Sequence, residues 1–322
     1  MIVCEMFSSA TLVLLYRRRM ARIGMMGGGE RRGYLYRRMA AIALPVAGTA
    51  LLGNLMGAVN AALIPQRLMA GGMEPGEAIS AFGILCGMTM PMLSLPTVFL
   101  GPLTLVMVPR IARSCALGRM DQVRGGVRRC IQVVALVILP CMALVTVVGP
   151  DLGLLLFGEA QAGAYMVPLA LATACGCFQS VLSGALNATD RQGTAAAIAL
   201  LCDVVQLVLT ILLMGRPSGG MDGFVTGVVV SSVLGMVLCG WMVCRSIKVY
   251  VPVWKSIGLP GLAALLSWQT SLLLFRCLKG AGAPEGLRVC AVLMFGGIIY
   301  LCALCAMGVD VGKFNRGGQK LR

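Results

Sequence analysis

The sequence predicts an all-α, polytopic membrane protein, a helical bundle of about eight full transmembrane helices with a shorter apolar piece before them. Three observations lead to this fold class. The 322 residues are 58% hydrophobic and 12% charged, with a mean hydropathy of +0.89, which soluble domains do not approach. The apolar residues gather in runs of about 20, the length that crosses a hydrocarbon core of about 30 Å. The 42 glycines and 14 prolines fit the close packing and kinked helices of membrane proteins.

Eight apolar runs are long enough to span a bilayer. They cover residues 39–64, 80–108, 130–149, 163–187, 193–214, 222–243, 257–275 and 287–307. The first apolar piece, residues 1–16, is too short to span comfortably. It also lacks the form of a signal peptide, because its arginines follow the apolar stretch instead of preceding it.

The run 80–108 contains repeated helix breakers. A proline removes a backbone donor and clashes with the preceding turn, and lipid tolerates it only where another group satisfies the freed carbonyl. The run is also long, since the 27 residues from Phe82 to Val108 would reach about 40 Å as a straight helix. We therefore expect this helix to bend, with Pro91, Pro96 and Pro102 as the bend positions.

The distribution of Lys and Arg predicts the orientation in the membrane. Alternate connections, beginning with the segment after residue 16 and ending with the C-terminal tail, hold 22 of the 27 basic residues, and the other connections hold five. We expect a multi-pass protein of the plasma membrane. The positive-inside rule then places the arginine-rich connections and the C-terminus in the cytoplasm. Orientation thus accounts for the net charge of +15, and no nucleic-acid partner is expected.

Residues 110–129, RIARSCALGRMDQVRGGVRR, form the most basic connection between two spans. One hypothesis is an interfacial helix held at anionic head groups, at about 1 kcal/mol per basic residue. The other is a contact for a substrate head group that carries phosphate. The head-group or interfacial candidates are Arg110 and Arg113 here and Arg67 after the first full span.

Polar side chains within the apolar runs are candidates for a substrate or ion pathway. Asp203 lies in the middle of its run, where a carboxylate costs about 2.5–3.5 kcal/mol on insertion scales. Spacings of three and four residues place other polar side chains on common helix faces, which can line a water-accessible cavity. The alternative is that the amides only join neighbouring helices, at under about 1–2 kcal/mol per hydrogen bond. The candidates are Asp203, Gln206 and Thr210, then Gln179, Ser183 and Asn187, and finally Asn60.

Small residues in the runs are interpreted as packing elements. The C-x-x-C of Cys302 and Cys305 lies inside a span, so we interpret it as small apolar packing and not as redox chemistry. The G-x-x-x-G pairs Gly83–Gly87 and Gly223–Gly227 predict close contact between helices.

No set of catalytic residues is apparent. The chain has no histidine, which excludes a Ser/His/Asp triad and a Cys/His zinc site, and it has no glycine loop with a lysine that would cradle phosphates. We expect no enzyme activity, no catalytic residue, no metal and no cofactor.

Several stretches resemble one family of exporters. FGILCGMTMPMLSLPTVFLGPLTLVMVPRIA, residues 82–112, is similar to the eighth helix of the stage V sporulation protein B group, in which a G-x-x-x-GM-x-x-P start leads to a V-P-x-I end. AVNAALIPQRLMAGGMEPGEAISAFG resembles that group's seventh helix and the loop after it. LLLFGEAQAGAYMVPLA and SVLSGALNATDRQ resemble its ninth-to-tenth connection and tenth helix. The group belongs to the superfamily of multidrug, oligosaccharidyl-lipid and polysaccharide exporters, which includes lipid II flippases.

The resemblance implies a fold of two six-helix lobes and two final helices, of which this chain carries the C-terminal part. Residues 1–38 would be a helix remnant and a basic cytoplasmic connection, 39–243 the C-terminal lobe, and 244–322 two additional helices and a cytoplasmic tail. We therefore expect this sequence to be a fragment that lacks an N-terminal lobe. It departs from the group at Asn60, where relatives often carry an acid, and at Arg110 and Arg113, where an acid often follows the V-P.

The resemblance also implies a function. It predicts a flippase or exporter that moves lipid-linked cell-envelope saccharides by alternating access, in polysaccharide or peptidoglycan biosynthesis and with a link to sporulation. The implied partners are the lipid-linked saccharide, membrane lipids, and either a separately encoded N-terminal lobe or a second copy. Two alternatives stay open: a cation-coupled multidrug exporter of the same superfamily, and a non-transporting scaffold for envelope assembly. A pyrophosphate-linked lipid calls for arginines in the cavity, whereas a cationic drug calls for carboxylates.

The orientation leads to the first testable prediction. Single cysteines at Ala112 and Gly318, in a background without the native cysteines, should resist a membrane-impermeant thiol reagent in intact cells, because both positions are expected in the cytoplasm. Both should react after the cells are opened. Rapid labelling of either cysteine in intact cells would reverse the orientation.

Overall fold

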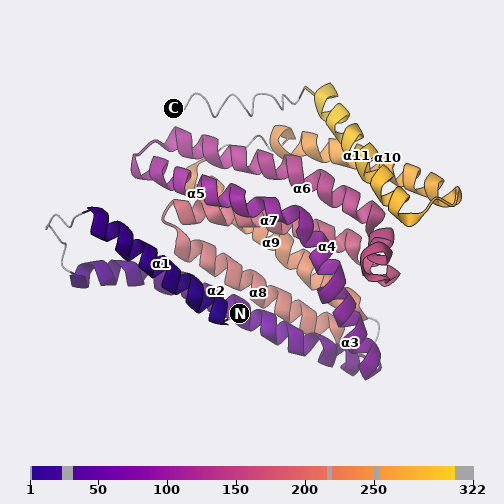
Figure 1. Ribbon diagram of the computed structural model, residues 1–322, viewed down its shortest axis with the longest axis horizontal. Helices are drawn as coiled ribbons and strands as arrows, with labels where there is room; N and C mark the ends of the chain where they lie inside the picture. The colour runs from indigo at the N-terminus through magenta and orange to yellow at the C-terminus, as the bar shows by residue number, and fades with distance from the viewer. Residues whose placement is uncertain (1, 24–31, 216–219, 250–251, 253, 309–322) are drawn as a thin grey trace. The chain divides into compact units, whose positions relative to one another are not determined.

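A computed structural model of the chain describes residues 2–23, 32–215, 220–249, 252 and 254–308 (Figure 1). Helices make up the regular structure of these ranges, and no β-strand occurs within them. The all-α prediction is confirmed. The chain divides into two compact units, Met1–Pro45 and Val46–Arg322, and the second holds the candidate residues identified above.

The first unit contains α1 (Ile2–Ile23) and the beginning of α2 (Arg32–Ala70). Helix α1 is longer than the predicted apolar piece, because it continues through the arginines that follow residue 16. Its side chains from residue 6 to residue 19 are exposed. Part of the basic connection, residues 24–31, lies outside the described residues.

The second unit holds helices that are long and apolar enough to cross a membrane. Seven such segments occur among the residues described: Pro75–Ala116, Met120–Phe157, Met166–Ala188, Gln192–Met214, Gly220–Ile247, Trp254–Gly280 and Glu285–Ala306. Each overlaps one predicted run from 80–108 onward, which confirms those seven. The remaining predicted run, 39–64, lies inside α2, which is not among the seven, and many of its side chains up to residue 50 lie outside those described.

The proline-rich run is irregular where the sequence predicts bending. It passes through α3 (Pro75–Ile84), a π-helical turn η1 (Leu85–Thr89), α4 (Met90–Ser94), a 3₁₀ turn η2 (Leu95–Phe99) and α5 (Leu100–Ala116). Pro91 and Pro96 fall in the first turns of α4 and η2, and Pro102 falls in the first turn of α5. Figure 1 shows the chain changing direction between α4 and α5.

Hydroxyl groups satisfy carbonyls along this irregular stretch. The Ser94 hydroxyl donates to the Pro91 carbonyl at 2.7 Å, and the Thr97 hydroxyl donates to the Ser94 carbonyl at 2.7 Å. The buried Thr89 hydroxyl donates to the carbonyl of Ala162 at 2.8 Å, in the short turn η3 (Ala160–Gly163). This last bond attaches the π-helical turn to the connection before α7 (Met166–Ala188).

Helix α6 (Met120–Phe157) is the centre of the second unit. It packs against α5 and α7 and also against α10 (Leu259–Gly280) and α11 (Glu285–Ala306). Pro140 lies inside α6, so the carbonyl of Leu136 lacks the amide that a regular helix would supply. The Tyr300 hydroxyl of α11 donates to this carbonyl at 3.0 Å. The proline therefore creates an attachment point for a distant helix.

Helices α10 and α11 are joined to each other and to α6 by further side chains. The buried Ser267 hydroxyl donates to the Gly296 carbonyl across the α10–α11 contact at 2.7 Å. The Trp268 indole donates to the Thr146 hydroxyl of α6 at 3.1 Å. Both helices belong to the same compact unit as the helices before them. The domain boundary expected at residue 244 stays a prediction.

A buried ion pair closes one end of this assembly. The Arg288 guanidinium of α11 donates through Nε to Asp151 Oδ2 of α6 at 2.6 Å, and the two side chains are only 12% and 4% exposed. Arg288 also donates to the carbonyl of Ala283 at 3.0 Å. The two residues are 137 positions apart, and no sequence pattern links them.

The connection 110–129 differs from the interfacial helix that the sequence analysis considers. Helix α5 continues to Ala116, the chain turns at Gly118 with φ of +68°, and α6 begins at Met120. The segment is therefore the tip of a helical hairpin, since each helix extends beyond its apolar run. Arg124 holds this tip to the end of α9 (Gly220–Ile247), donating to the Ile247 carbonyl at 3.1 Å.

The ion pair leads to the second prediction. Asp151→Asn should destabilise the protein by about 3–5 kcal/mol, because it leaves the Arg288 charge buried without its partner. The double variant Asp151→Leu/Arg288→Met should restore most of this loss, since apolar replacement of a buried pair is often neutral. Thermal unfolding of the purified protein in detergent measures both.

The exposed pair of Arg124 and Asp121, 3.2 Å apart, supplies the matched control. Asp121→Asn should barely change the unfolding temperature, because an exposed pair contributes little. An Asp151→Asn protein that unfolds at the wild-type temperature would contradict the structural role of the buried pair.

Candidate functional site

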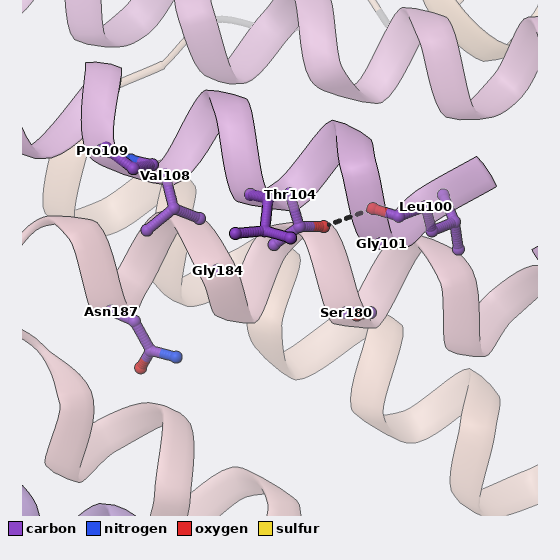
Figure 2. Close-up of a pocket in the computed structure, with 9 residues that line it drawn as sticks. Leu100, Gly101, Thr104, Val108, Pro109, Ser180, Gly184 and Asn187 are labelled. Carbon is purple, nitrogen blue, oxygen red and sulfur yellow. Dashed lines mark hydrogen bonds between the residues drawn. The ribbon is translucent and has the colours of Figure 1, made fainter. Parts of the chain in front are cut away.

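A groove of about 580 Å³ runs between α5 and α7 (Met166–Ala188) (Figure 2). The side chains that line it are mostly apolar, with three polar ones among them. They are Leu100, Gly101, Thr104, Leu105, Val108 and Pro109 from α5, and Ser180, Gly184 and Asn187 from α7. The volume falls within the range of small-molecule sites, about 300–1,000 Å³.

Glycines bring the two helices together beside this groove. A Cβ atom at Gly184 would lie 3.3 Å from Cγ2 of Val108 and 3.6 Å from Cγ2 of Thr104, so α5 crosses α7 closely there. Figure 2 shows Thr104 and Val108 above Gly184, with Asn187 at one end of the groove. The Thr104 hydroxyl donates to the Leu100 carbonyl at 2.8 Å, whereas the exposed Asn187 amide makes no side-chain hydrogen bond with a described residue. Asn187 is therefore available to a ligand.

The polar stripe predicted on α7 divides between two surroundings. Asn187 lines the groove, but the Gln179 side chain lies against Gly235 of α9, at the position that a Cβ there would occupy. Ser183, between them, is half-buried. The groove face of α7 instead consists of Ser180, Gly184 and Asn187, a face that the spacing of the larger polar residues does not reveal. The four-residue spacing of the small residues Ser180 and Gly184 is the sequence feature that could have indicated this groove face.

The polar residues of α8 (Gln192–Met214) are also separated. Thr210 is completely buried, its hydroxyl donates to the Gln206 carbonyl at 2.8 Å, and it packs where Gly227 of α9 leaves room. Asp203 and Gln206 are half-buried. Within the part of the chain that the structure describes, no side-chain hydrogen bond or ion pair involves Asp203. Thr210 is thus a packing residue, whereas Asp203 remains a candidate for the pathway.

Two candidates lie on the part of α2 that belongs to the second unit. The Oδ1 atom of Asn60 is buried and has no hydrogen-bond partner among the residues described. The Arg67 side chain of α2 lies beside the C-terminal end of α8. Its Nη1 atom is 3.9 Å from the position that a Cβ at Gly215 would occupy. A cation there is favoured by the negative end of the α8 dipole. The structure does not join Asn60 or Arg67 to Asp203 by any hydrogen bond between described residues.

The two basic candidates of the α5–α6 hairpin differ in their surroundings. Arg110 lines a second, smaller groove together with Arg129, which the sequence analysis did not single out. Arg113 is exposed and lies outside that groove. No group of three or more metal-ligating side chains occurs among the residues searched, which are the described ones.

Comparison with known proteins gives one family and two relatives. The profile of the family described as lipid II flippase MurJ matches residues 89–278. The stage V sporulation protein B of Bacillus subtilis (strain 168) is 23% identical over 218 residues, which are 68% of this chain and 41% of that protein. Sporulation protein YkvU of the same organism is 28% identical over 85 residues, which are 26% of this chain and 19% of that protein. The matched region thus spans about two fifths of the length of the stage V sporulation protein B.

The different surroundings of Asn187 and Thr210 lead to the third prediction. In a background without native cysteines, Asn187→Cys should react rapidly with a water-soluble maleimide, and Thr210→Cys should not, because a thiolate forms only where water reaches the sulfur. Mass spectrometry of the purified protein in detergent measures both rates. Similar rates at the two positions would show that the groove carries no water or that α8 and α9 are not tightly packed.

Proposed function

Since the chain belongs to the lipid II flippase MurJ family, we propose that it moves lipid-linked precursors of the cell envelope across the plasma membrane by alternating access. The observation that carries this proposal is the family match over residues 89–278, which includes α5, α7 and α8 and hence the groove and Asp203. The seven apolar helices found in the described residues support a multi-pass membrane protein.

In this mechanism the second unit forms one wall of the transport pathway. Alternating access rocks one helix bundle against another around a site near the middle of the membrane. The groove between α5 and α7 provides an apolar surface with a few polar groups, and α8 provides the carboxylate of Asp203. A bundle that covers these residues would keep Asp203 away from lipid, where an unpartnered carboxylate is costly.

That opposing bundle is the implied partner. We propose that it is either a separately encoded N-terminal lobe or a second copy of this chain, because one six-helix lobe supplies only one side of an alternating-access cavity. The substrate class is a lipid-linked saccharide of peptidoglycan or polysaccharide synthesis. The relatives named for sporulation support a role in envelope synthesis at that stage. The positive-inside bias supports a cytoplasmic C-terminus.

Asp203 also favours a second candidate, a cation-coupled drug exporter. Asp203 lies within α8 without an ion-pair partner among the described residues, whereas the described arginines of the α5–α6 hairpin lie outside the apolar runs 80–108 and 130–149. A cationic substrate would be attracted to such a carboxylate. Transport of an organic cation in place of a polyprenyl-linked sugar would establish this alternative.

The test of the proposed function is reconstitution, and it gives the fourth prediction. The protein, purified with whatever subunit it retains, is placed in vesicles with a fluorescent polyprenyl-linked sugar, and an impermeant quencher reports movement between leaflets. We expect protein-dependent flipping by the assembled complex and none by a cross-linked, demonstrably monomeric sample. Absence of flipping by every assembly would contradict the function, and flipping by the monomer would contradict the need for an opposing bundle.

Asp203→Asn supplies the residue-level arm of the same assay. The neutral amide should reduce flipping to background without reducing expression, since removal of a charge from the middle of a span makes insertion easier. Asp222→Asn, at the exposed start of α9, is the matched control and should transport like the wild type. Wild-type flipping by the Asp203→Asn protein would assign Asp203 a structural role.

A further inference from the structure

The second groove lies between the last turns of α5 and the first turns of α6 and has a volume of about 250 Å³. Its lining comes in equal parts from the two helices. These residues are Met107, Arg110, Ile111 and Ser114 from α5, and Gln122, Gly125, Gly126 and Arg129 from α6. The volume is slightly below the usual range for whole small-molecule ligands, about 300–1,000 Å³, and suits a head group better.

The helical spacing and two glycines create this basic groove. On each helix the lining residues recur at steps of three and four, so each set occupies one face. A Cβ atom at Gly126 would lie 3.3 Å from Cγ1 of Ile111, which shows close approach, whereas a Cβ at Gly125 would meet no atom within 4 Å. Gly125 therefore leaves open space beside a tight helix contact.

The polar groups of the basic groove are suited to an anion. Neither Arg110 nor Arg129 forms an ion pair among the described residues, and the hairpin's one acid, Asp121, is paired with Arg124 instead. The Ser114 hydroxyl lies 3.4 Å from Oε1 of Gln122, so the amide nitrogen of Gln122 remains available as a donor. The positive end of the α6 dipole points to the same region. Two guanidinium groups and an amide donor thus border one groove, and no carboxylate is among the residues that line it.

The position of the basic groove indicates which anion it meets. Arg110 follows the apolar run 80–108 and Arg129 precedes the run 130–149, so both lie where the hydrocarbon ends, at the depth of lipid phosphates. Met107 and Ile111 line both this groove and a small apolar hollow that continues along α5 with Leu103 and Val108. Leu105 and Val106, on other faces of α5, are 76% and 51% exposed, so acyl chains can contact this helix next to the groove.

We propose that the basic groove binds the phosphate group of a membrane lipid in the cytoplasmic leaflet, with Arg110 and Arg129 as its charged contacts. The proposal is independent of transport, because an ordinary phospholipid bound there need not be moved. All four arginines of this comparison are exposed, but Arg110 and Arg129 line the groove and Arg113 and Arg128 lie outside it.

The experiment is native mass spectrometry of the purified full chain in neutral detergent, titrated with dioleoyl phosphatidylglycerol. The double variant Arg110→Gln/Arg129→Gln removes the groove charges. The control Arg113→Gln/Arg128→Gln removes the same charge from the same hairpin outside the basic groove. A third variant, Gly125→Leu, fills the open space and keeps every charge. Thermal unfolding checks that each variant is folded, and inorganic pyrophosphate serves as a soluble competitor.

Loss of the two groove arginines should weaken lipid binding about tenfold or more, at about 1 kcal/mol for each basic residue. Gly125→Leu should also weaken it, and the Arg113/Arg128 control should retain nearly wild-type binding. Equal loss in both double variants would overturn the proposal, because it would show attraction by diffuse charge. Undiminished binding in the groove variants would overturn it as well. Pyrophosphate binding to the basic groove without any lipid binding would show a site for soluble phosphate and reject the lipid.

Discussion

The satisfaction of backbone hydrogen bonds in hydrocarbon is the constraint on which this structure depends. No water is present there to replace a missing donor, so every proline in a spanning helix leaves a carbonyl that another group has to satisfy. At Pro140 of α6 that carbonyl belongs to Leu136, and its donor is Tyr300, which is 164 residues away. This hydrogen bond satisfies the free carbonyl of α6 and also holds α11 against α6. Proline in α6 is thus part of how the last two helices join the lobe.

Helix α6 is held differently at its two ends. At its C-terminal end the buried pair of Asp151 and Arg288 ties it to α11, at a separation of 2.6 Å and almost without exposure. At its N-terminal end Arg129 remains without an ion-pair partner among described residues and borders a hollow. The same end is held to α9 by the hydrogen bond from Arg124 to the Ile247 carbonyl. Both ends of α6 are therefore anchored to neighbouring helices, and the surface beside Arg129 is left open to a ligand.

The sequence was sufficient to locate seven spanning helices and the irregular stretch around Pro91 and Pro96, because length, hydropathy and proline act locally. It was insufficient for residues 110–129, since basic residues are equally compatible with a surface helix and with helix ends that extend past the membrane. It also missed the pair of Asp151 and Arg288, which are 137 residues apart. Only the docking of α11 on α6 brings those two charges together.

The polar candidates show why a helix face cannot be assigned from spacing alone. Gln179 and Thr210 lie opposite Gly235 and Gly227 of α9, and each glycine leaves the room that its neighbour's polar side chain fills. Asn187 lies one turn from Gly184 on its own helix, and there the adjacent helix α5 leaves a groove. Gly83 and Gly87, in contrast, are exposed, and no atom of the described residues lies within 4 Å of a Cβ position at either, so the described part of the chain does not show the close contact predicted for that pair. A glycine therefore creates either a contact or a hollow, and the side chain on the facing helix determines which. Because that helix comes from elsewhere in the sequence, the difference between a packed polar residue and a ligand-facing one is decided by tertiary structure.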